Sequence, residues 1–307
     1  MKRVISAGIA GSLLALASPA MAATITNGDI SMGLFDDASL GSGGVGLAYA
    51  PVGDAITPGC LCEGWGVAGN GTGSYTYGNS ADSGFASAAL TDVTASSAKS
   101  TVVTTGGLTI THTYSPVPGA ALFQVDVAIT NTSGAAVNDV RYARTLDWDV
   151  PPGHFGDDFT TIYGGTPAGP GGKVLHTSLD PFAPPDPMVT RSILADENRT
   201  NEPGDLGGYF IFSFGLLDAD ETIDFTTFIG AASSTRLLLS QFATLGVEAY
   251  SYTFDNDGPA TFGYGFVGLG LPPIDPPDEV PEPAMFGLFA LGLATLAGRR
   301  RFAKQLS

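Results

Sequence analysis

Residues 122–130 read Leu-Phe-Gln-Val-Asp-Val-Ala-Ile-Thr, a stretch in which apolar and polar side chains alternate. Successive side chains of a β-strand point to opposite sides of its sheet, so this period places Gln124 and Asp126 on one face and apolar residues on the other. The apolar face consists of Phe123, Val125, Val127 and Ile129. The stretch predicts a strand with one buried face, and the turn residues Asn-Thr-Ser-Gly at 131–134 end it.

The segments on both sides of this strand have the same character. Residues 90–93, 101–105 and 108–114 are rich in Thr and Val, and Gly106 and Gly107 are suited to a hairpin turn. Residues 140–150 also alternate. Their apolar face carries Val140, Tyr142, Leu146, Trp148 and Val150, and their polar face carries Arg141, Asp147 and Asp149. Sequential strands joined by short turns are typical of an antiparallel sandwich.

One helix and further strands complete the body. Residues 234–245 predict a helix, because Ser233 or Ser234 can cap its start and Gly246 can end it. The other candidate strands are residues 30–34, 45–50, 209–214, 223–229, 248–254 and 261–267. We therefore predict an all-β fold, a large antiparallel β-sandwich of super-sandwich-like size, with one short soluble helix.

Two stretches of the body carry few strand signals. Residues 24–88 are rich in glycine, and residues 151–201 form a loop-rich insert that contains His154, His176 and the run Pro-Pro-Asp-Pro at 184–187. We expect the insert to cover one edge or end of the sandwich. The body then extends over residues 24–271, and the Pro-rich acidic residues 272–283 predict a stiff linker.

The first 23 residues have the three parts of a secretory signal peptide. Lys2 and Arg3 form a basic start, residues 5–17 are apolar, and residues 18–22 offer a cleavage site of small residues. Cleavage after Ala22 or Ala23 would leave a body that has been exported from the cytoplasm.

The end of the chain combines three further signals. The motif residues Val280, Pro281, Glu282 and Pro283 precede an uncharged, apolar segment at 284–298, which Arg299, Arg300 and Arg301 follow. Residues 284–307 therefore predict a transmembrane helix with a basic tail. About 15 helical residues rise only about 22 Å, so snorkelling arginines would have to extend their reach. The arginines are expected on the cytoplasmic side. A buried core helix is the alternative, but such helices seldom end in three arginines.

This order of motif, apolar segment and arginine cluster resembles the PEP-CTERM sorting signal of Gram-negative envelope proteins. The resemblance covers the last 28 residues of 307 and does not extend to the body. It implies a transient inner-membrane anchor. It also implies an exosortase-type membrane protease as partner, which would recognise Pro281, Glu282 and Pro283 and release the body to the cell surface or its polysaccharide matrix.

The composition makes the exported part strongly acidic. Six of the 13 Lys and Arg residues lie in the two ends, so residues 24–283 carry seven basic and 30 acidic residues, a formal charge near −23. Such a body should repel nucleic acid and anionic lipid, and it could attract cations. The 42 glycines and 21 prolines agree with strands joined by turns.

Cys60 and Cys62 are the only cysteines, and three alternatives remain for them. A disulfide between the two fits an oxidising compartment and is favoured. Free thiols or intermolecular bridges are the second alternative. A metal site is the third, and it would need partners from three scattered histidines. We expect the neighbouring Trp65 to pack against this loop.

Asp147 and Asp149 are the first candidates for chemistry. Two positions apart on one strand, they would lie roughly 7 Å apart and face the same way, and they could be a carboxylate pair for glycoside hydrolysis. We favour a structural alternative, in which Asp147 pairs with Arg141 or Arg144 and Asp149 starts a turn. We therefore assign no catalytic residue.

The run Asp255-Asn256-Asp257-Gly258 is similar to the start of a calcium loop. An EF-hand would place Glu at the twelfth position, where this chain has Phe266, and a hairpin turn explains the same residues. Calcium at Asp255 and Asp257 is thus a candidate, and we expect no other cofactor. His112 lies in a Thr-rich strand and is expected at the surface or an edge.

The sequence thus predicts an exported surface or extracellular-matrix protein that is not an enzyme. Its expected role is structural or adhesive, in exopolysaccharide or biofilm. One alternative is a carbohydrate-binding module that uses Trp65, Tyr75 and Tyr77. The other is a glycan-processing enzyme that uses the Asp147 and Asp149 region.

Overall fold

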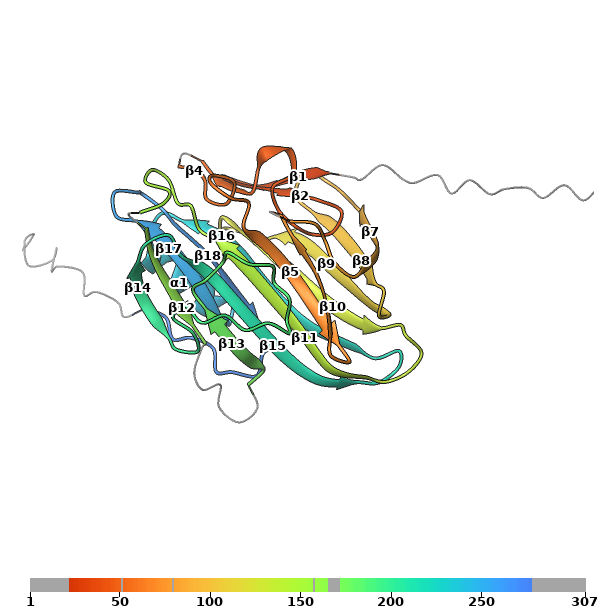
Figure 1. Ribbon diagram of the computed structural model, residues 1–307. Helices are drawn as coiled ribbons and strands as arrows, with labels where there is room; N and C mark the ends of the chain where they lie inside the picture. Colours follow the sequence, from red (N-terminus) through yellow and green to blue (C-terminus); the bar gives the residue numbers. More distant parts are fainter. Residues whose placement is uncertain (1–21, 51, 79, 157, 165–171, 278–307) are drawn as a thin grey trace, which may run out of the picture. The chain divides into compact units, whose positions relative to one another are not determined.

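The computed structural model describes residues 22–277 except residues 51, 79, 157 and 165–171 (Figure 1). The strands and the helix of this part belong to one compact unit that ends at Ile274. The strands form three sheets, and every pairing between them is antiparallel. The described body is therefore the all-β, antiparallel structure that the alternating stretches predict.

The largest sheet has nine strands and contains the strand predicted at residues 122–130. In spatial order its strands are β14 (Arg199–Pro203), β12 (Asp158–Tyr163), β17 (Ala249–Asp255), β18 (Thr261–Val267), β16 (Thr222–Ala232), β10 (Leu122–Asn131), β9 (Leu108–Pro116), β8 (Ala98–Thr104) and β7 (Phe85–Thr91). Along β10, Val125, Val127 and Ile129 are buried and Asp126 is exposed, which confirms the predicted face. The turn at Gly107 joins β8 to β9, as predicted.

Two smaller sheets accompany it. The five-stranded sheet contains β13 (Val174–Ser178), β15 (Gly207–Leu217), β11 (Val137–Asp147), β5 (Glu63–Gly69) and β6 (Thr72–Tyr77), in that order. The four-stranded sheet contains β1 (Ala23–Asn27), β2 (Ile30–Leu34), β3 (Leu47–Tyr49) and β4 (Gly53–Asp54), with the short 3₁₀ turn η1 (Ser42–Gly44) between β2 and β3.

The nine- and five-stranded sheets lie over each other as two layers with an aromatic core between them (Figure 1). The ring of Tyr142 on β11 meets that of Phe225 on β16 at 4.9 Å between centroids. Phe212 on β15 meets Phe266 on β18 at 4.7 Å. Rings from both sheets interdigitate in this way, so their packing is that of a β-sandwich.

The helix α1 (Thr235–Thr244) packs on the outer face of the nine-stranded sheet, against β16 and β18. Ser234 caps its start, since its hydroxyl accepts a hydrogen bond from the main-chain N–H of Leu237 at 3.2 Å. Leu238 and Phe242 are buried in a second apolar cluster on that face. Gly246 follows the helix with a φ of 76°, which favours glycine. The predicted helix is confirmed, with bounds shorter by one residue at each end.

The insert at residues 151–201 lies at an edge of the sandwich, as expected, but it is more than a loop. It supplies β12 and β13 and the start of β14, so it extends two sheets. Its remaining loop covers a face of the sandwich, because the guanidinium of Arg191 lies 3.6 Å over the ring of Tyr209 on β15. The hydroxyl of Tyr209 donates to the carbonyl of Val189 at 2.9 Å. These strands are short and stand among Gly and Pro, so their alternation was hidden by turn residues.

The sequence also missed β5 in the Gly-rich part of the chain, although this strand pairs with both β11 and β6. The glycines of β5 are needed because other parts of the backbone approach them closely, and not because they form turns. A Cβ at Gly64 would lie 2.1 Å from the carbonyl oxygen of Thr76, and one at Gly66 would lie 2.2 Å from that of Pro185. Glycine lowers strand propensity, so a strand that requires it gives a weak signal.

The two predicted end segments lie outside the residues that the structure describes. Residues 1–21 of the signal peptide and the transmembrane helix at 284–307 are not among the described residues, and Ala23 already begins β1. Within the described part, the structure contains no helix with the length and apolar character needed to cross a bilayer.

Candidate functional site

The sorting signal predicted at Val280, Pro281, Glu282 and Pro283, with Arg299, Arg300 and Arg301, lies outside the described residues. The other predicted residues belong to the body, and several of them meet at one end of β11.

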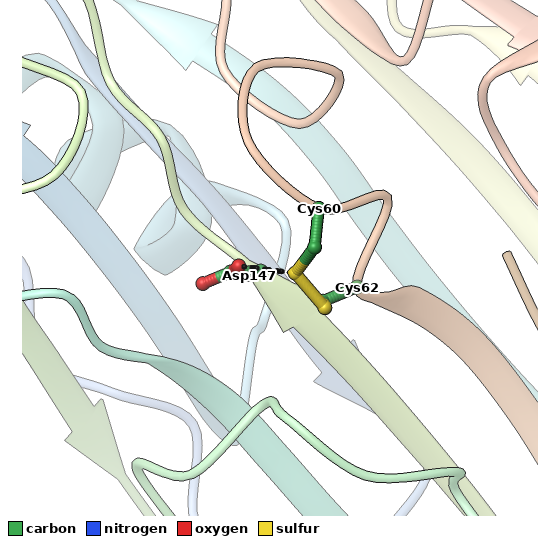
Figure 2. A group of neighbouring side chains, drawn as sticks. All are labelled: Cys60, Cys62 and Asp147. Atoms are coloured by element: carbon green, nitrogen blue, oxygen red, sulfur yellow. Dashed lines mark hydrogen bonds between the residues drawn. A yellow bond between two sulfur atoms is a disulfide. The ribbon is translucent and has the colours of Figure 1, made fainter. Parts of the chain in front are cut away.

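Cys60 and Cys62 form a disulfide in the loop between β4 and β5 (Figure 2). Their Cα atoms lie 5.1 Å apart, and Cys62 is buried. The structure thus has the first of the three alternatives for these cysteines. A disulfide sulfur is no thiolate, so the paired cysteines are not soft metal ligands.

The side chain of Asp147, the last residue of β11, points at this disulfide (Figure 2). Its Oδ2 lies 3.3 Å from Sγ of Cys60, and its Oδ1 has no hydrogen-bond partner in the described structure. A disulfide-bonded sulfur carries no hydrogen, so only a protonated Asp147 could make a hydrogen bond across this contact. Asp147 is 1 % exposed. An ionised Asp147 would therefore be a buried charge with little compensation, since only the main-chain N–H of Trp148 favours it.

Asp149 and Asp205 complete a group of three carboxylates with Asp147. One oxygen from each lies within 4.8 Å of the other two. Asp149 is 1 % exposed, and neither of its oxygens has a hydrogen-bond partner among the described residues. Asp205 comes from the segment before β15 and is exposed. Three separate parts of the chain, including the disulfide loop, therefore converge on these oxygens.

The disulfide loop covers Asp149 closely, and Gly59 makes this possible. Gly59 has a φ of 69°, which disfavours other residues, and a Cβ there would lie 2.6 Å from the ring of Phe155 and 3.3 Å from Oδ2 of Asp149. The main-chain N–H of Asp149 donates to the carbonyl of Ala55 at 2.9 Å. The loop is thus held close to Asp149 at two positions, Ala55 and Gly59.

Burial and mutual repulsion disfavour the charged forms of these acids. Burial first, and then the charge of Asp205, raise the pKa of Asp147 to about 7. Burial, followed by Asp147, Asp205, Asp158 and Asp54, raises the pKa of Asp149 to about 8. Burial likewise raises the pKa of Asp158 to about 7, although the N–H of Val150 works against it.

The predicted ion pair of Asp147 with Arg141 or Arg144 is wrong. Arg141 pairs with Asp139 at 2.8 Å, and Arg144 pairs with Glu63. Arg144 is three positions from Asp147 and therefore faces the other side of the strand. Arg141 faces the same side, but six positions of a strand separate it from Asp147 by about 20 Å.

Neighbouring aspartates show what a structural carboxylate looks like in this fold. The oxygens of Asp54 accept hydrogen bonds from four main-chain N–H groups, those of Gly46, Leu47, Ile56 and Thr57. Such carboxylates are satisfied by the backbone. The contrast singles out Asp147 and Asp149.

Asp255, the first predicted calcium ligand, is also satisfied by the backbone. It accepts from the N–H of Asp257 at 2.7 Å through Oδ1 and from the N–H of Gly153 at 2.7 Å through Oδ2. This arrangement is an Asx turn between β17 and β18, as the hairpin alternative describes. Calcium at Asp255 and Asp257 stays a prediction.

His112, expected at the surface or an edge, is instead in the core. It is 1 % exposed, and its Nε2 lies 3.1 Å from the hydroxyl of Tyr142. Its strand β9 is covered on that face by the second sheet, which the local pattern could not show. The other histidines have separate partners. His154 lies 3.0 Å from the carbonyl of Asp149, and His176 pairs with Asp196 at 2.7 Å.

The proposed sugar-binding aromatics are largely buried. Trp65 is fully buried, stacks with Phe85 and donates through Nε1 to the carbonyl of Asp37 at 2.7 Å. Tyr77 is 3 % exposed, and only Tyr75 is half-buried. The ring of Trp65 also contacts His112 and Tyr142 in the core, so a sugar cannot reach its face, and its packing against the Cys60–Cys62 loop stays a prediction.

The arrangement at the end of β11 has the donor set of a cation site, with three carboxylates and few competing partners. Asp147 and Asp149 are too enclosed to hold a sugar ring between them, since both are 1 % exposed. Sequence reasoning found these two acids but missed Asp205. Asp205 stands after Gly204 in a turn and carries no local signal of its own.

Comparison with known proteins identifies the C-terminal segment. The PEP-CTERM protein-sorting motif family matches residues 279–301. A search of curated proteins found none that matches the chain. The chain thus carries a PEP-CTERM sorting domain, as the resemblance of its last residues implied.

Proposed function

We propose that this PEP-CTERM domain-containing protein is a structural or adhesive component of the cell surface or its extracellular polymer matrix. Its sorting motif directs it to the envelope through an exosortase-type protease. The observation that carries the proposal is the order of parts along the chain. The motif at residues 279–301 follows a body of antiparallel sheets that ends at Ile274.

The body has properties that suit long residence outside the cell. Its two main sheets enclose a continuous aromatic core, and its only cysteines are joined to each other. Its formal charge near −23 over residues 24–283 keeps copies soluble and apart. A stable scaffold of this kind can present loops to a polymer.

The test of sorting uses a host that has its own sorting protease, one tag directly after the signal peptide and a second tag at the C-terminus of the unprocessed chain. We expect the wild type to lose its C-terminal tag and to be found at the surface or in the matrix. Replacing Pro281, Glu282 and Pro283 by alanine should leave a full-length, membrane-bound form, because the extended motif is gone. The matched control replaces Asp275, Pro276 and Pro277, which are likewise one acidic residue and two prolines of the same linker.

The test of the matrix role compares a deletion strain with strains that express each form. Deletion should reduce surface attachment and retained matrix polymer, and the wild type should restore both, whereas the triple-alanine motif variant should not. If the deletion changes neither attachment nor retained polymer, the structural role is wrong even when sorting is intact.

A glycan-binding body is the second candidate, and an aromatic stripe on the outer face of the nine-stranded sheet favours it. The stripe consists of Phe159 and Tyr163 on β12 and Tyr250, Tyr252 and Phe254 on β17. Two pairs stack across the strands, Phe159 on Phe254 at 5.6 Å and Tyr163 on Tyr250 at 5.3 Å. Tyr163 is 41 % exposed, so its ring is open to a ligand. Sugars stack on such faces.

Affinity electrophoresis in gels that contain neutral or acidic polysaccharides tests this candidate. A glycan-binding stripe would retard the wild type in a neutral gel, and Tyr163→Ala would reduce the retardation. Leu216→Ala, at a side chain that is 57 % exposed on β15, is the control. Equal mobility of the wild type and Tyr163→Ala in every gel would remove the candidate.

A further inference from the structure

The buried acids at the end of β11 are a feature that sorting and matrix assembly do not explain. Asp147 and Asp149 are each 1 % exposed, and with Asp205 they bring three carboxylate oxygens within 4.8 Å of one another. Acidic residues often gather on the surface of an acidic protein. These two are instead enclosed by the loop that carries the disulfide.

Their oxygens lack the partners that buried carboxylates normally have. Both oxygens of Asp149 and Oδ1 of Asp147 make no hydrogen bond to any described residue, and Oδ2 of Asp147 lies 3.3 Å from the sulfur of Cys60. Asp54 shows that the fold supplies N–H donors where it needs them. An orphaned, buried carboxylate requires a proton, a water or a cation.

No basic side chain compensates these charges. The seven Lys and Arg residues of the body are all in the described part, and none of them forms an ion pair with Asp147, Asp149 or Asp205. The ring of His154 lies close to Asp149, but its Nδ1 is 3.0 Å from the main-chain carbonyl of Asp149 and not paired with the carboxylate. Asp54 and Asp158 add negative charge to the surroundings.

We propose that Asp147, Asp149 and Asp205 bind a calcium ion through their carboxylates. Calcium takes oxygen ligands at 2.3–2.6 Å, so ligands on opposite sides of one ion lie about 4.6–5.2 Å apart. Three oxygens within 4.8 Å of one another therefore fit around a single ion. Asp205 is exposed, which leaves a route for the ion and room for water ligands.

The chemistry of the donors distinguishes calcium from other metals. Zinc prefers sulfur and nitrogen, and the nearby sulfurs are bonded to each other. Magnesium dehydrates reluctantly and is usually held by one or two carboxylates, whereas three carboxylates and a partly closed site suit calcium. The ion would join the end of β11 to the segment before β15, beside the disulfide loop. It should therefore stabilise the fold, independently of the proposed function.

The test uses the exported protein purified from its host and freed of metal with EDTA. Calorimetric titration with calcium chloride should show about one ion per chain, with a Kd in the range of about 0.1–1 mM that is typical of extracellular modules. The melting temperature should rise in about 5 mM calcium chloride beyond its value in sodium chloride of equal ionic strength.

Two variants and two controls locate the ion. Asp149→Asn and Asp205→Asn should each weaken calcium binding by at least about 10-fold. Without calcium, Asp149→Asn should melt no lower than the wild type, because neither oxygen of Asp149 makes a hydrogen bond that the substitution would remove. The controls are Asp126→Asn, an exposed acid on β10, and Asp257→Asn in the hairpin turn. Both should bind calcium within about twofold of the wild type.

Several results would overturn the proposal. One is a wild type whose heat of titration and rise in melting temperature are the same with calcium chloride as with sodium chloride of equal ionic strength. Another is calcium binding that survives in both Asp149→Asn and Asp205→Asn. A loss confined to Asp257→Asn would place the ion at the turn, and magnesium binding as tight as calcium would refute the choice of metal.

Discussion

The buried ion pair between Glu63 and Arg144 leads to the prediction that can be worked out most fully. Arg144 is on the inward face of β11, and its guanidinium contacts Oε1 of Glu63 on the neighbouring strand β5. The Arg144 side chain is 8 % exposed and that of Glu63 is fully buried. Oε2 of Glu63 accepts a hydrogen bond from the N–H of Leu40 at 2.7 Å. The pair therefore connects two sheet strands to the N-terminal segment.

Removing both partners should cost less than the two single removals added together. Arg144→Met leaves the Glu63 carboxylate buried without its cation, and breaking such a pair typically lowers the free energy of unfolding by about 3–5 kcal/mol. Glu63→Gln keeps an acceptor for Leu40 but leaves the guanidinium unpaired, so we expect a similar loss. The double variant Glu63→Gln/Arg144→Met has no unpaired charge. We expect its loss to be smaller than the sum of the single losses by about 2–3 kcal/mol.

Urea unfolding followed by tryptophan fluorescence measures these values, because Trp65 and Trp148 are fully buried and become exposed on unfolding. Arg141→Met on the same strand is the matched control. The pair of Arg141 with Asp139 is partly exposed, with 22 % and 41 % of the side chains accessible, so its loss should amount to less than about 1 kcal/mol. The reasoning fails if Arg144→Met and Arg141→Met cost the same, or if the two single losses simply add in the double variant.

Three further predictions concern other parts of the body. Burial lowers the pKa of His112 to about 3. Its neutral form therefore stabilises the fold above pH 6.5, and this stability is lost as the pH falls, because the unfolded chain binds a proton that the buried His112 of the folded chain does not. In urea titrations, the difference in free energy of unfolding between the wild type and His112→Gln should shrink by about 3 kcal/mol between pH 7 and pH 4.5. A constant difference would contradict the lowered pKa. Replacing Cys60 and Cys62 by serine should lower the free energy of unfolding by only about 1–2 kcal/mol, because the disulfide closes a very short loop, and a loss above about 4 kcal/mol would mean that it holds more than its own loop. Gly66→Ala should lower the free energy of unfolding by about 1–3 kcal/mol in the same assay, because a Cβ would lie 2.2 Å from the carbonyl oxygen of Pro185. The control Gly106→Ala, where the nearest atom would lie at 3.7 Å, should change it by less than about 0.5 kcal/mol. Equal losses would show that the loop around Pro185 moves freely.

The elements predicted well are those whose signals are local. The alternation along β10 needs only its own residues, and so does the helix α1, whose capping Ser234 and terminal Gly246 stand at its ends. The strands β16, β17 and β18 were found for the same reason. When one face of a strand or helix is buried along its whole length, apolar residues recur in the sequence with the period of that element.

Elements that depend on distant partners were missed. The glycines of β5 are required by Thr76 and Pro185, which lie 12 and 119 positions away from Gly64 and Gly66 and cannot be read from the strand itself. Within residues 151–201, β12 forms by pairing with β17 and β13 forms by pairing with β15, and both partners lie later in the chain. Propensity alone is a weak guide where tertiary contacts decide.

The class of fold, the acidity of the body and the presence of a sorting signal can be read from the amino-acid sequence. The sorting signal is legible because it is a linear segment that does not depend on how the body folds. Which acids meet depends on the tertiary structure. Asp147 and Asp149 are separated from Asp205 by more than 50 residues, and a carboxylate becomes orphaned or satisfied only when the chain has closed around it. Burial, and with it the pKa of a side chain and its demand for a partner, is a property of that enclosure and not of neighbours along the chain.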